Sequence, residues 1–236
     1  MADGQSLRSG KGDGLSFPSI GGAARAGLCT DCGVSRMGDG KACGKACQFI
    51  APDYDALEQR VHGRNATGQG DEAYFGVTHA MHRARLDRPL DGAQWTGVTT
   101  ALAAALLSSG AVTAVLSVAP DPFDRWKPVP VIVTDPAALE SVRGMRMGWA
   151  PTLALLEPAA QAGHRRIALI GIPCQVHALR ALEAELGFER IFVIGTPCSD
   201  NTTTENFHKF LGLIDPKPET ISYLEFRADY RVELRF

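Results

Sequence analysis

The sequence has little of what would place it in several common classes of protein. Its 24 Lys and Arg residues are balanced by 26 Asp and Glu, and a formal charge of −2 offers no basic surface for nucleic acid. No stretch comes near the roughly 20 apolar residues that span a bilayer, because Thr, Ser and Gly interrupt the most hydrophobic run, Val98 to Ala119. We therefore expect no nucleic-acid partner and no transmembrane segment. At 236 residues, the chain can bury a core without disulfides.

The N-terminal region also lacks the basic start, apolar run and cleavage site of a secretory signal. Residues 1–27 are rich in Gly and Ser and are predicted to form a flexible leader. Asp3 and Asp13 disfavour an organellar transit peptide. We expect a reducing compartment, the bacterial cytoplasm or, in a plastid-bearing source, the chloroplast stroma. In such a compartment, closely spaced cysteines more often bind metal or carry out redox chemistry than form disulfides.

Helices and strands are predicted to alternate after Gln94, which indicates an α/β fold. A helix is expected in TGVTTALAAALLSS, and buried strands are expected in AVTAVLSVA and PVPVIV. The segment PAALESV is predicted to be a helix, and the glycine-containing loop RGMRMGWAP leads into another helix, TLALLEPAAQAG.

An internal repeat gives the clearest topological prediction. Residues 166–187 and 190–212 both read as an apolar strand, then Gly-x-Pro-Cys, then a helix. This order predicts a right-handed βαβ unit with parallel strands. If the strands are adjacent, Cys174 and Cys198 lie side by side at their carboxyl ends, each at a helix N-terminus that stabilises a thiolate.

The last segment, ISYLEFRADYRVELRF, alternates apolar and polar residues like two strands joined around Ala228 to Tyr230. The sequence stops inside the second strand. We therefore expect this chain to be the front part of a longer protein.

The spacing Cys-x2-Cys-x10-Cys-x3-Cys indicates a metal site. Its members are Cys29, Cys32, Cys43 and Cys47. Four thiolates at this density suit either a tetrahedral structural zinc or a [4Fe-4S] cluster, and the spacing alone leaves both open alongside unliganded thiols.

Cys174 and Cys198 have no cysteine close to them in the sequence. They could be two small buried hydrophobic residues, a redox disulfide, or part of the ligand set of a cluster. The last role requires a second cysteine pair, which would lie beyond Phe236.

Weaker signals surround these motifs. The segment Thr96 to Thr100 could present a helix N-terminus to a phosphate, or Thr could simply cap the helix. Arg143 and Arg146 flank Gly144 and could clamp a pyrophosphate or a carboxylate, or be solvated. His177 could face the same cavity as Cys174, three residues before it, or the sheet.

Eight segments in order resemble one known family: CTDCG, CGKACQFIAPDY, GAQWTGVTTAL, WKPVPV, RGMRMGWAPTLALLEPA, GIPCQ, GTPCSDNTTTENF and YLEFRADYRVELRF. The chain resembles, from about Leu28 to Phe236, the iron–sulfur flavoproteins in the family of deazaflavin-linked hydrogenase β subunits, and among them reductases of chlorophyll-type tetrapyrroles. The resemblance implies FAD, two [4Fe-4S] clusters and reduced ferredoxin as electron donor. The implied reaction reduces the C8 vinyl group of divinyl chlorophyllide, or of a related tetrapyrrole, to ethyl.

The resemblance also assigns residues. It implies that the first four cysteines hold one cluster and that Cys174 and Cys198 hold part of a second. Flavin-binding residues are expected in two segments: Thr96, Gly97, Thr99 and Thr100, and the loop containing Arg143 and Arg146. By position alone, Asp200 and His177 are candidate proton donors.

The implied organisation is a cysteine-rich iron–sulfur module and linker over residues 28–76, followed by a mixed or parallel-sheet α/β flavin-binding domain. Residues 77–160 would form the N-terminal part of that domain, and residues 161–236 an incomplete C-terminal part.

Three other functions stay open from the sequence. Two share the cofactors and differ in substrate: reduction of 7-hydroxymethyl chlorophyll a, and reduction of deazaflavin as part of a hydrogenase or dehydrogenase. The third is a binding module in which zinc stabilises the first four cysteines and no reaction occurs.

Overall fold

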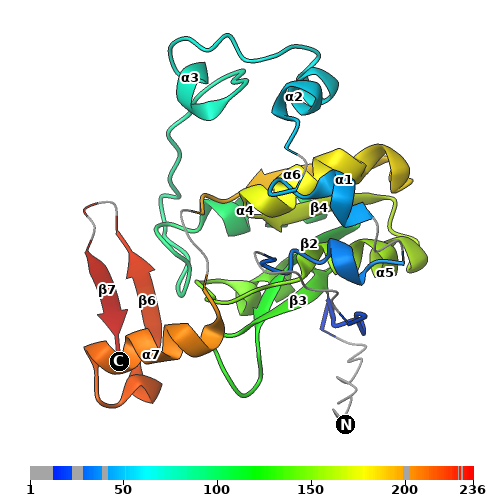
Figure 1. The fold of residues 1–236 in the computed structure, drawn as a ribbon. Coiled ribbons are helices and arrows are strands. Elements are labelled where there is room, and N and C mark those ends of the chain that lie inside the picture. Colours follow the sequence, from blue (N-terminus) through cyan, green and yellow to red (C-terminus); the bar gives the residue numbers. More distant parts are fainter. Residues whose placement is uncertain are drawn as a thin grey trace.

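A mixed five-stranded β-sheet forms the centre of the fold (Figure 1). The computed structural model describes residues 13–22, 29–38, 42–50, 52–198, 202–227, 229 and 231–236. The strand order is β1-β3-β2-β4-β5, and a separate hairpin contains β6 and β7. The strands are β1 Leu15–Ser16, β2 Ala114–Pro120, β3 Pro128–Val133, β4 Arg166–Gly171, β5 Arg190–Gly195, β6 Tyr223–Phe226 and β7 Val232–Arg235.

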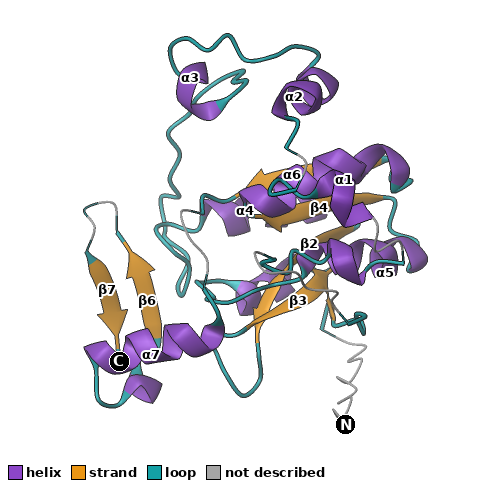
Figure 2. Ribbon diagram, viewed as in Figure 1, coloured by secondary structure: helices purple, strands orange, loops and turns teal. Residues whose placement is uncertain are grey.

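The α-helices are α1 Cys43–Ala46, α2 Tyr54–His62, α3 Glu72–Phe75, α4 Val98–Ser108, α5 Leu156–Gln161, α6 Pro173–Leu182 and α7 Thr204–Ile214. Helices cover both faces of the five-stranded sheet, with α4 on one face and α1, α5 and α6 on the other, whereas α2 and α3 lie on an extension away from the sheet and α7 lies beside the hairpin (Figure 2). Short 3-10 turns span Val34–Arg36, Pro136–Val142, Thr152–Leu155, Glu183–Glu185 and Pro218–Thr220. Within the described ranges, no helix has the length and apolar character needed to cross a membrane.

The predicted βαβ unit is confirmed. β2, β4 and β5 are parallel neighbours, whereas β3 pairs antiparallel with β2. In the β4–β5 pair, Gly171 lies opposite Gly195, so the two strands end at the same edge of the sheet. This edge is where open α/β folds place their ligands.

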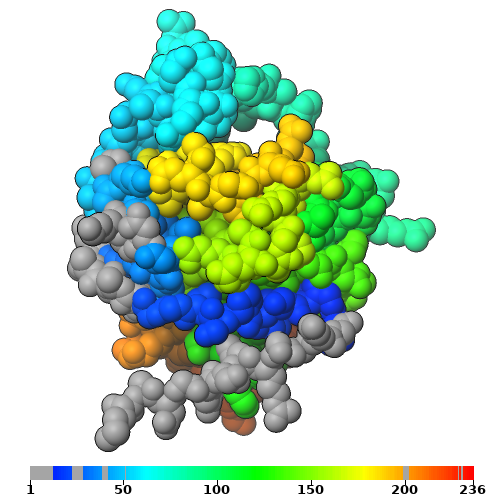
Figure 3. Space-filling view, turned by 90° about the vertical axis from the view of Figure 1, so that its right-hand side faces the viewer, coloured from blue at the N-terminus to red at the C-terminus, as the bar shows by residue number. Residues whose placement is uncertain are grey.

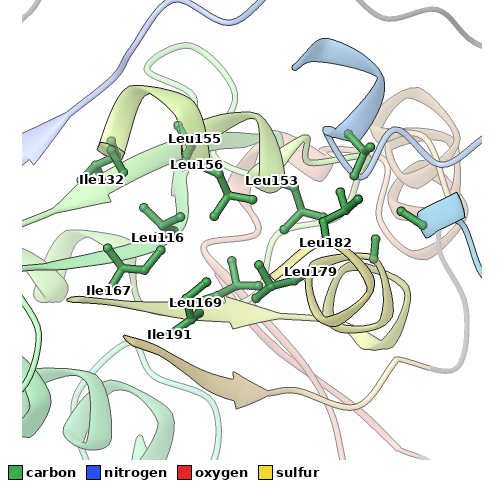
Figure 4. Close-up of a cluster of buried hydrophobic side chains, with 14 of the residues drawn as sticks. Leu116, Ile132, Leu153, Leu155, Leu156, Ile167, Leu169, Leu179, Leu182 and Ile191 are labelled. Carbon is green, nitrogen blue, oxygen red and sulfur yellow. The ribbon is translucent and has the colours of Figure 1, made fainter. Parts of the chain in front are cut away.

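Hydrophobic side chains cover the sheet on both faces, which explains the continuous apolar runs of β2 and β4. Leu116, Ile167 and Leu169 point to one face and pack with residues of α6 and of the 152–156 segment (Figure 4). Val115 and Ala168 point to the opposite face, which α4 covers. The same alternation therefore gives each strand two buried faces.

The N-terminal cysteine segment belongs to the first of these cores. Val34 and Ala46 are buried in it, and the partly buried Cys32 and Cys43 pack against it. In the space-filling view, the cyan α2 region lies against the yellow α6 region (Figure 3). A hydrogen bond of 3.1 Å from the Arg60 guanidinium to the Arg180 carbonyl joins these two elements.

The hairpin packs with α7 into a third apolar cluster. Trp126, Phe207, Leu211, Ile221 and Leu224 form its buried part. The predicted pairing of the last two strands is confirmed, with Tyr223 opposite Arg235. Two residues of the predicted turn, Ala228 and Tyr230, lie outside the described residues.

Two predicted helices differ from the structure. Pro136–Val142 forms a 3-10 helix, which begins with Asp135 accepting a hydrogen bond from the Ala137 N–H. The segment predicted as one helix over 152–163 starts as a 3-10 turn and becomes α-helical only at Leu156. Pro158 explains the change, because its ring lacks an N–H and would clash with the carbonyl of residue 154 in a continuous α-helix.

Candidate functional site

The two repeat cysteines lie at the carboxyl edge of the sheet. Cys174 is the second residue of α6 and is half-buried, whereas the exposed Cys198 follows the end of β5 by three residues. Gly171 and Gly195 pair at the ends of β4 and β5, and each cysteine follows its glycine by three residues, so both lie at the same edge of the sheet, where the charge of Cys198 acts on Cys174. Their predicted proximity is confirmed.

The predicted helix N-terminus at Cys198 is wrong, because α7 begins only at Thr204. At Cys174 the predicted helix N-terminus is present, and its backbone N–H groups favour the thiolate, but they do not decide the pKa of this thiol. Burial raises the pKa of Cys174, and this outweighs the opposing hydrogen bonds from the Thr30 hydroxyl and the Gln175 N–H. Asp200 lies outside the described residues.

The first cysteine pair forms a tight loop that presents backbone N–H groups to sulfur. The Asp31 N–H donates to Cys29 Sγ at 3.3 Å, and the Val34 N–H makes the corresponding bond to Cys32. Gly33, which follows Cys32, has φ +112°, and a Cβ there would lie 2.4 Å from the Ala154 nitrogen. Only glycine fits this close approach.

A buried ion pair holds this loop. Asp31 is 2% exposed and has φ +53°, and the Arg36 guanidinium donates to both of its carboxylate oxygens, at 2.9 and 2.5 Å. Arg36 also donates to the Gly21 carbonyl at 2.6 Å. These contacts fix the loop between the N-terminal segment and the sheet.

The second cysteine pair flanks α1, which packs against α6: Cys43 is its first residue and Cys47 follows its last. The Cys47 N–H donates to the Cys43 carbonyl at 3.0 Å. His177 Nδ1 lies 3.0 Å from the Ala46 carbonyl, the residue before Cys47, and the Tyr54 ring covers the imidazole edge-on. His177 Nε2 is buried and has no hydrogen-bond partner among the described residues. His177 therefore faces the cysteine segment rather than the sheet.

The two cysteine sets meet at Cys32. Burial, as the largest cause, raises the pKa of Cys32 to about 12, and the charges of Cys174, Cys43 and Cys29 add to the effect. Within the described part of the chain, no group of three or more His, Cys, Asp or Glu side chains is arranged to hold a metal ion. The soft thiol donors and the N–H groups aimed at sulfur fit the chemistry of an iron–sulfur or zinc site. The ligand assignment itself stays a prediction.

A second region with binding chemistry is a pocket of about 430 Å³ between the 143–146 loop and the β6–β7 hairpin. It is lined by Arg125, Arg143, Arg146 and Arg235, together with aromatic residues. Burial lowers the pKa of Arg146, and the charge of Arg125 lowers it further. Concentrated positive charge of this kind favours an anionic ligand.

The arginine loop is anchored to the loop that precedes α4. Arg143 donates to the Asp91 carbonyl at 2.8 Å, and Gly144 lies close to the Gly92 carbonyl. The Nε atoms of Arg143 and Arg146 are buried and have no hydrogen-bond partner among the described residues. The structure thus brings the loop of Arg143 and Arg146 next to the segment leading to the predicted flavin-binding threonines.

The helix that begins near Thr96 is not capped by a threonine side chain. Gly97 is the N-cap residue of α4, with φ +90° and no side-chain capping bond. The Thr96 hydroxyl instead accepts a hydrogen bond from the Leu86 N–H at 3.1 Å. The first turn, which contains Thr99 and Thr100, therefore offers backbone N–H groups without a side-chain acceptor. None of the described lining of the arginine pocket comes from this turn.

Sequence reasoning missed several residues of this region. Arg125 and Arg235 carried no motif and reach the pocket only through the tertiary fold. Glu225 occupies an alternating strand, yet it is 6% exposed. The one sequence signal for Glu225 was that a carboxylate stands among the apolar residues of β6.

Comparison with known proteins gives a consistent family. Residues 81–157 match the N-terminal family model of the coenzyme F420 hydrogenase/dehydrogenase β subunit, and residues 164–236 match the C-terminal model. The two matches follow each other in order and together cover more than half of the chain.

Curated relatives include proteins of photosynthetic and methanogenic organisms. The chain is 37% identical over 209 residues to an uncharacterized protein of Nostoc sp., covering 88% of this chain and 53% of that protein. It is 36% identical over 222 residues to the chloroplastic 7-hydroxymethyl chlorophyll a reductase of Oryza sativa subsp. japonica, covering 93% and 46%. It is 32% identical over 91 residues to one of the subunits of the F(420)H(2) dehydrogenase of Methanosarcina mazei, covering 39% and 25%. The chain spans about half the length of the first two relatives.

A solved structure supports the fold. One chain of the F420-reducing [NiFe] hydrogenase complex from Methanosarcina barkeri, in its xenon derivative, matches with a TM-score of 0.55 and 19% identity. The match covers 61% of this chain and 55% of that one. The predicted mixed-sheet α/β fold is thereby confirmed.

Proposed function

The chain belongs to the family of coenzyme F420 hydrogenase/dehydrogenase β subunits, and from this premise we propose that it forms part of an iron–sulfur flavoprotein oxidoreductase. The proposed reaction reduces the C8 vinyl group of divinyl chlorophyllide to ethyl. Reduced ferredoxin is the proposed electron donor. The similarity to a reductase of a chlorophyll-type tetrapyrrole supports this substrate class.

The observation that carries the proposal is the meeting of the two cysteine sets at one edge of the sheet. Thr30, which lies between Cys29 and Cys32, bonds to Cys174, and Cys174 neighbours Cys198. Burial disfavours the thiolate at Cys32, Cys43 and Cys174, and a bound metal centre would offset that cost by coordinating the deprotonated sulfur.

We assign the cysteines to two neighbouring [4Fe-4S] clusters. Cys29, Cys32, Cys43 and Cys47 would hold one of them. Cys174 and Cys198 would supply part of the ligand set of the other. The electrostatic interaction between Cys32 and Cys174 supports clusters that are close enough to exchange electrons.

The region proposed to bind FAD combines the uncapped start of α4 with the arginine loop. Backbone N–H groups of the first turn, with Thr99 and Thr100, suit a phosphate, and Arg143 and Arg146 suit a pyrophosphate. Reduction of vinyl to ethyl takes two electrons and two protons, whereas two reduced ferredoxins each deliver one electron. A bound flavin would link one-electron and two-electron transfer.

The proton donor is proposed from position. His177 is buried, covered by Tyr54 and hydrogen-bonded to the Ala46 carbonyl, so we assign it to holding α1 on α6 rather than to proton transfer. Asp200, beside Cys198 in the sequence, then stays the candidate.

The test is anaerobic purification of this chain, followed by its absorption spectrum and its iron, sulfide, flavin and zinc content. We expect a brown protein with about four irons for each complete cluster. Cys32→Ser should remove the iron of the first cluster, and Ser109→Ala, at the exposed end of α4, should leave the iron content unchanged. A colourless protein containing one zinc would contradict the enzyme proposal and support the zinc-stabilised binding module.

Substrate assays with chemically reduced ferredoxin separate the enzymatic candidates. Divinyl chlorophyllide should gain two hydrogen atoms, which mass spectrometry detects. The second candidate, 7-hydroxymethyl chlorophyll a reduction, is favoured by the rice relative and would give a product lacking one oxygen. The third, coenzyme F420 reduction, is favoured by the family match and would bleach the deazaflavin absorption.

A further inference from the structure

Trp95 has an unusual combination of exposure and backbone strain. It is one of two non-glycine residues in the described chain with positive φ, at +53°, and it is 68% exposed. A bulky residue in this conformation is a genuine outlier. Because two-thirds of the residue faces solvent, packing of the indole against its own fold does not account for the strain.

A buried carboxylate holds this conformation. Glu225, which is 6% exposed, accepts a hydrogen bond of 2.8 Å from the Trp95 N–H and one of 2.5 Å from the Tyr223 hydroxyl. Glu225 and Trp95 are 130 residues apart in the sequence. The hairpin strand β6 therefore fixes the backbone that presents the indole to solvent.

Further bonds pin the same loop on both sides of Trp95. The Gly97 N–H donates to the Gln94 carbonyl at 3.1 Å, and the Leu90 N–H donates to the Thr96 carbonyl at 3.2 Å. Such over-determined, strained positions cluster at ligand-binding sites. The other non-glycine residue with positive φ, Asp31, lies in the predicted cluster-binding loop.

The surroundings of Trp95 indicate which ligand its indole would meet. Thr96 and the uncapped α4 N-terminus follow it directly. Tyr223, which shares Glu225 with Trp95, lines the arginine pocket together with Arg143 and Arg235. An exposed indole whose backbone is anchored through Glu225 to a residue of the arginine pocket suits a planar conjugated ring that carries an anionic group.

We propose that Trp95 is a stacking platform for the planar ring of such a ligand, and that Glu225 is the residue that positions it. The proposal rests on the proposed function, in which two ligands have this chemistry. FAD joins an isoalloxazine ring to a pyrophosphate, and chlorophyllide joins a macrocycle to a carboxylate. Aromatic side chains bind such rings by offset stacking.

The experiment measures dissociation constants of flavin-free protein for FAD and, separately, for chlorophyllide a. Trp95→Ala should weaken binding of the stacked ligand about tenfold, and Trp95→Phe should restore most of that loss. Tyr74→Ala provides the matched control, because Tyr74 is an aromatic residue that is 86% exposed on α3, outside this region. The ligand whose affinity falls identifies the ring that stacks.

A spectroscopic readout separates stacking from a general effect on folding. A stacked indole should quench flavin fluorescence, and Trp95→Ala should reduce this quenching while circular dichroism stays unchanged. Glu225→Ala should weaken binding of the same ligand although the indole is retained, because the loop loses its anchor. Glu225→Gln should weaken it less, since the amide oxygen can still accept from the Trp95 N–H.

Different results would refute the stacking role of Trp95 and the proposed function. If the unmodified chain binds one of these ligands and Trp95→Ala binds it within twofold as tightly, the stacking role is refuted and the proposed function stands. If the unmodified chain binds neither FAD nor chlorophyllide a, the proposed function and the stacking role both fail.

Discussion

The strained backbone at Trp95 gives a stability prediction with an unusual sign. Trp95→Gly and Trp95→Ala remove the same indole contacts, so their difference reports the backbone alone. We expect the glycine variant to be the more stable of the two. At most positions in a folded chain, alanine is the more stable residue.

The magnitude follows from two opposing terms. A left-handed conformation costs a residue with a Cβ about 1–2 kcal/mol, and glycine avoids this cost. The greater freedom of glycine in the unfolded chain costs about 0.4–1 kcal/mol in return. The glycine variant should therefore exceed the alanine variant by about 0.5–1 kcal/mol in free energy of unfolding.

Urea denaturation followed by circular dichroism measures this difference. With an m value of about 2 kcal/mol/M, the midpoints should differ by about 0.3–0.5 M. The control is the same pair of substitutions at the helical and exposed Tyr74, where alanine should be the more stable variant by about 0.5–1 kcal/mol. Equal midpoints at position 95, or a higher midpoint for Trp95→Ala, would show that the strain is absent.

Three further predictions concern the cysteine loop and the hairpin. Gly33→Ala should destabilise the fold and lower the iron content, because its Cβ would meet the Ala154 nitrogen at 2.4 Å, and a normal iron content would contradict the predicted fit. Asp31→Asn should cost about 2 kcal/mol in free energy of unfolding, because it removes the charge that Arg36 binds through two hydrogen bonds, and an unchanged urea midpoint would refute this. Burial raises the pKa of Tyr223 above its ordinary value near 10, so its contribution to stability is present below pH 10 and is lost as the pH rises through the raised value. The free energy of unfolding of Tyr223→Phe should therefore fall less steeply between pH 10 and pH 11 than that of the unmodified protein. Equal slopes for the two proteins would show that this hydroxyl does not contribute to the pH dependence.

The repeat could be predicted well because its information is local. Each copy places a strand, a Gly-x-Pro-Cys turn and a helix within about 22 residues, and the crossover through the first helix returns the chain so that β5 runs parallel to β4. The helix at α4 and the strands β2 and β3 were predicted for the same reason, since their apolar periodicity is continuous.

The parts that sequence reasoning missed depend on distant contacts. Thr30 bonds to Cys174, and Glu225 bonds to the Trp95 backbone, yet no spacing in the sequence connects either pair. At Cys174 the helix N-terminus lowers the pKa locally, as predicted, whereas the burial that outweighs it comes from the whole tertiary fold and could not be predicted.

The docking of α1 on α6 has a consequence for how the protein matures during synthesis. Ala46 and His177, which join these helices, are 131 residues apart, and ribosomes add about 5–20 residues each second. The first four cysteines therefore leave the ribosome roughly 7–26 s before the helix that covers them exists. During that interval their thiols are open to oxidation and to stray metal ions. Insertion of a cluster, in the proposed function, then has to follow synthesis of β4 and α6 or depend on factors that protect the nascent cysteines.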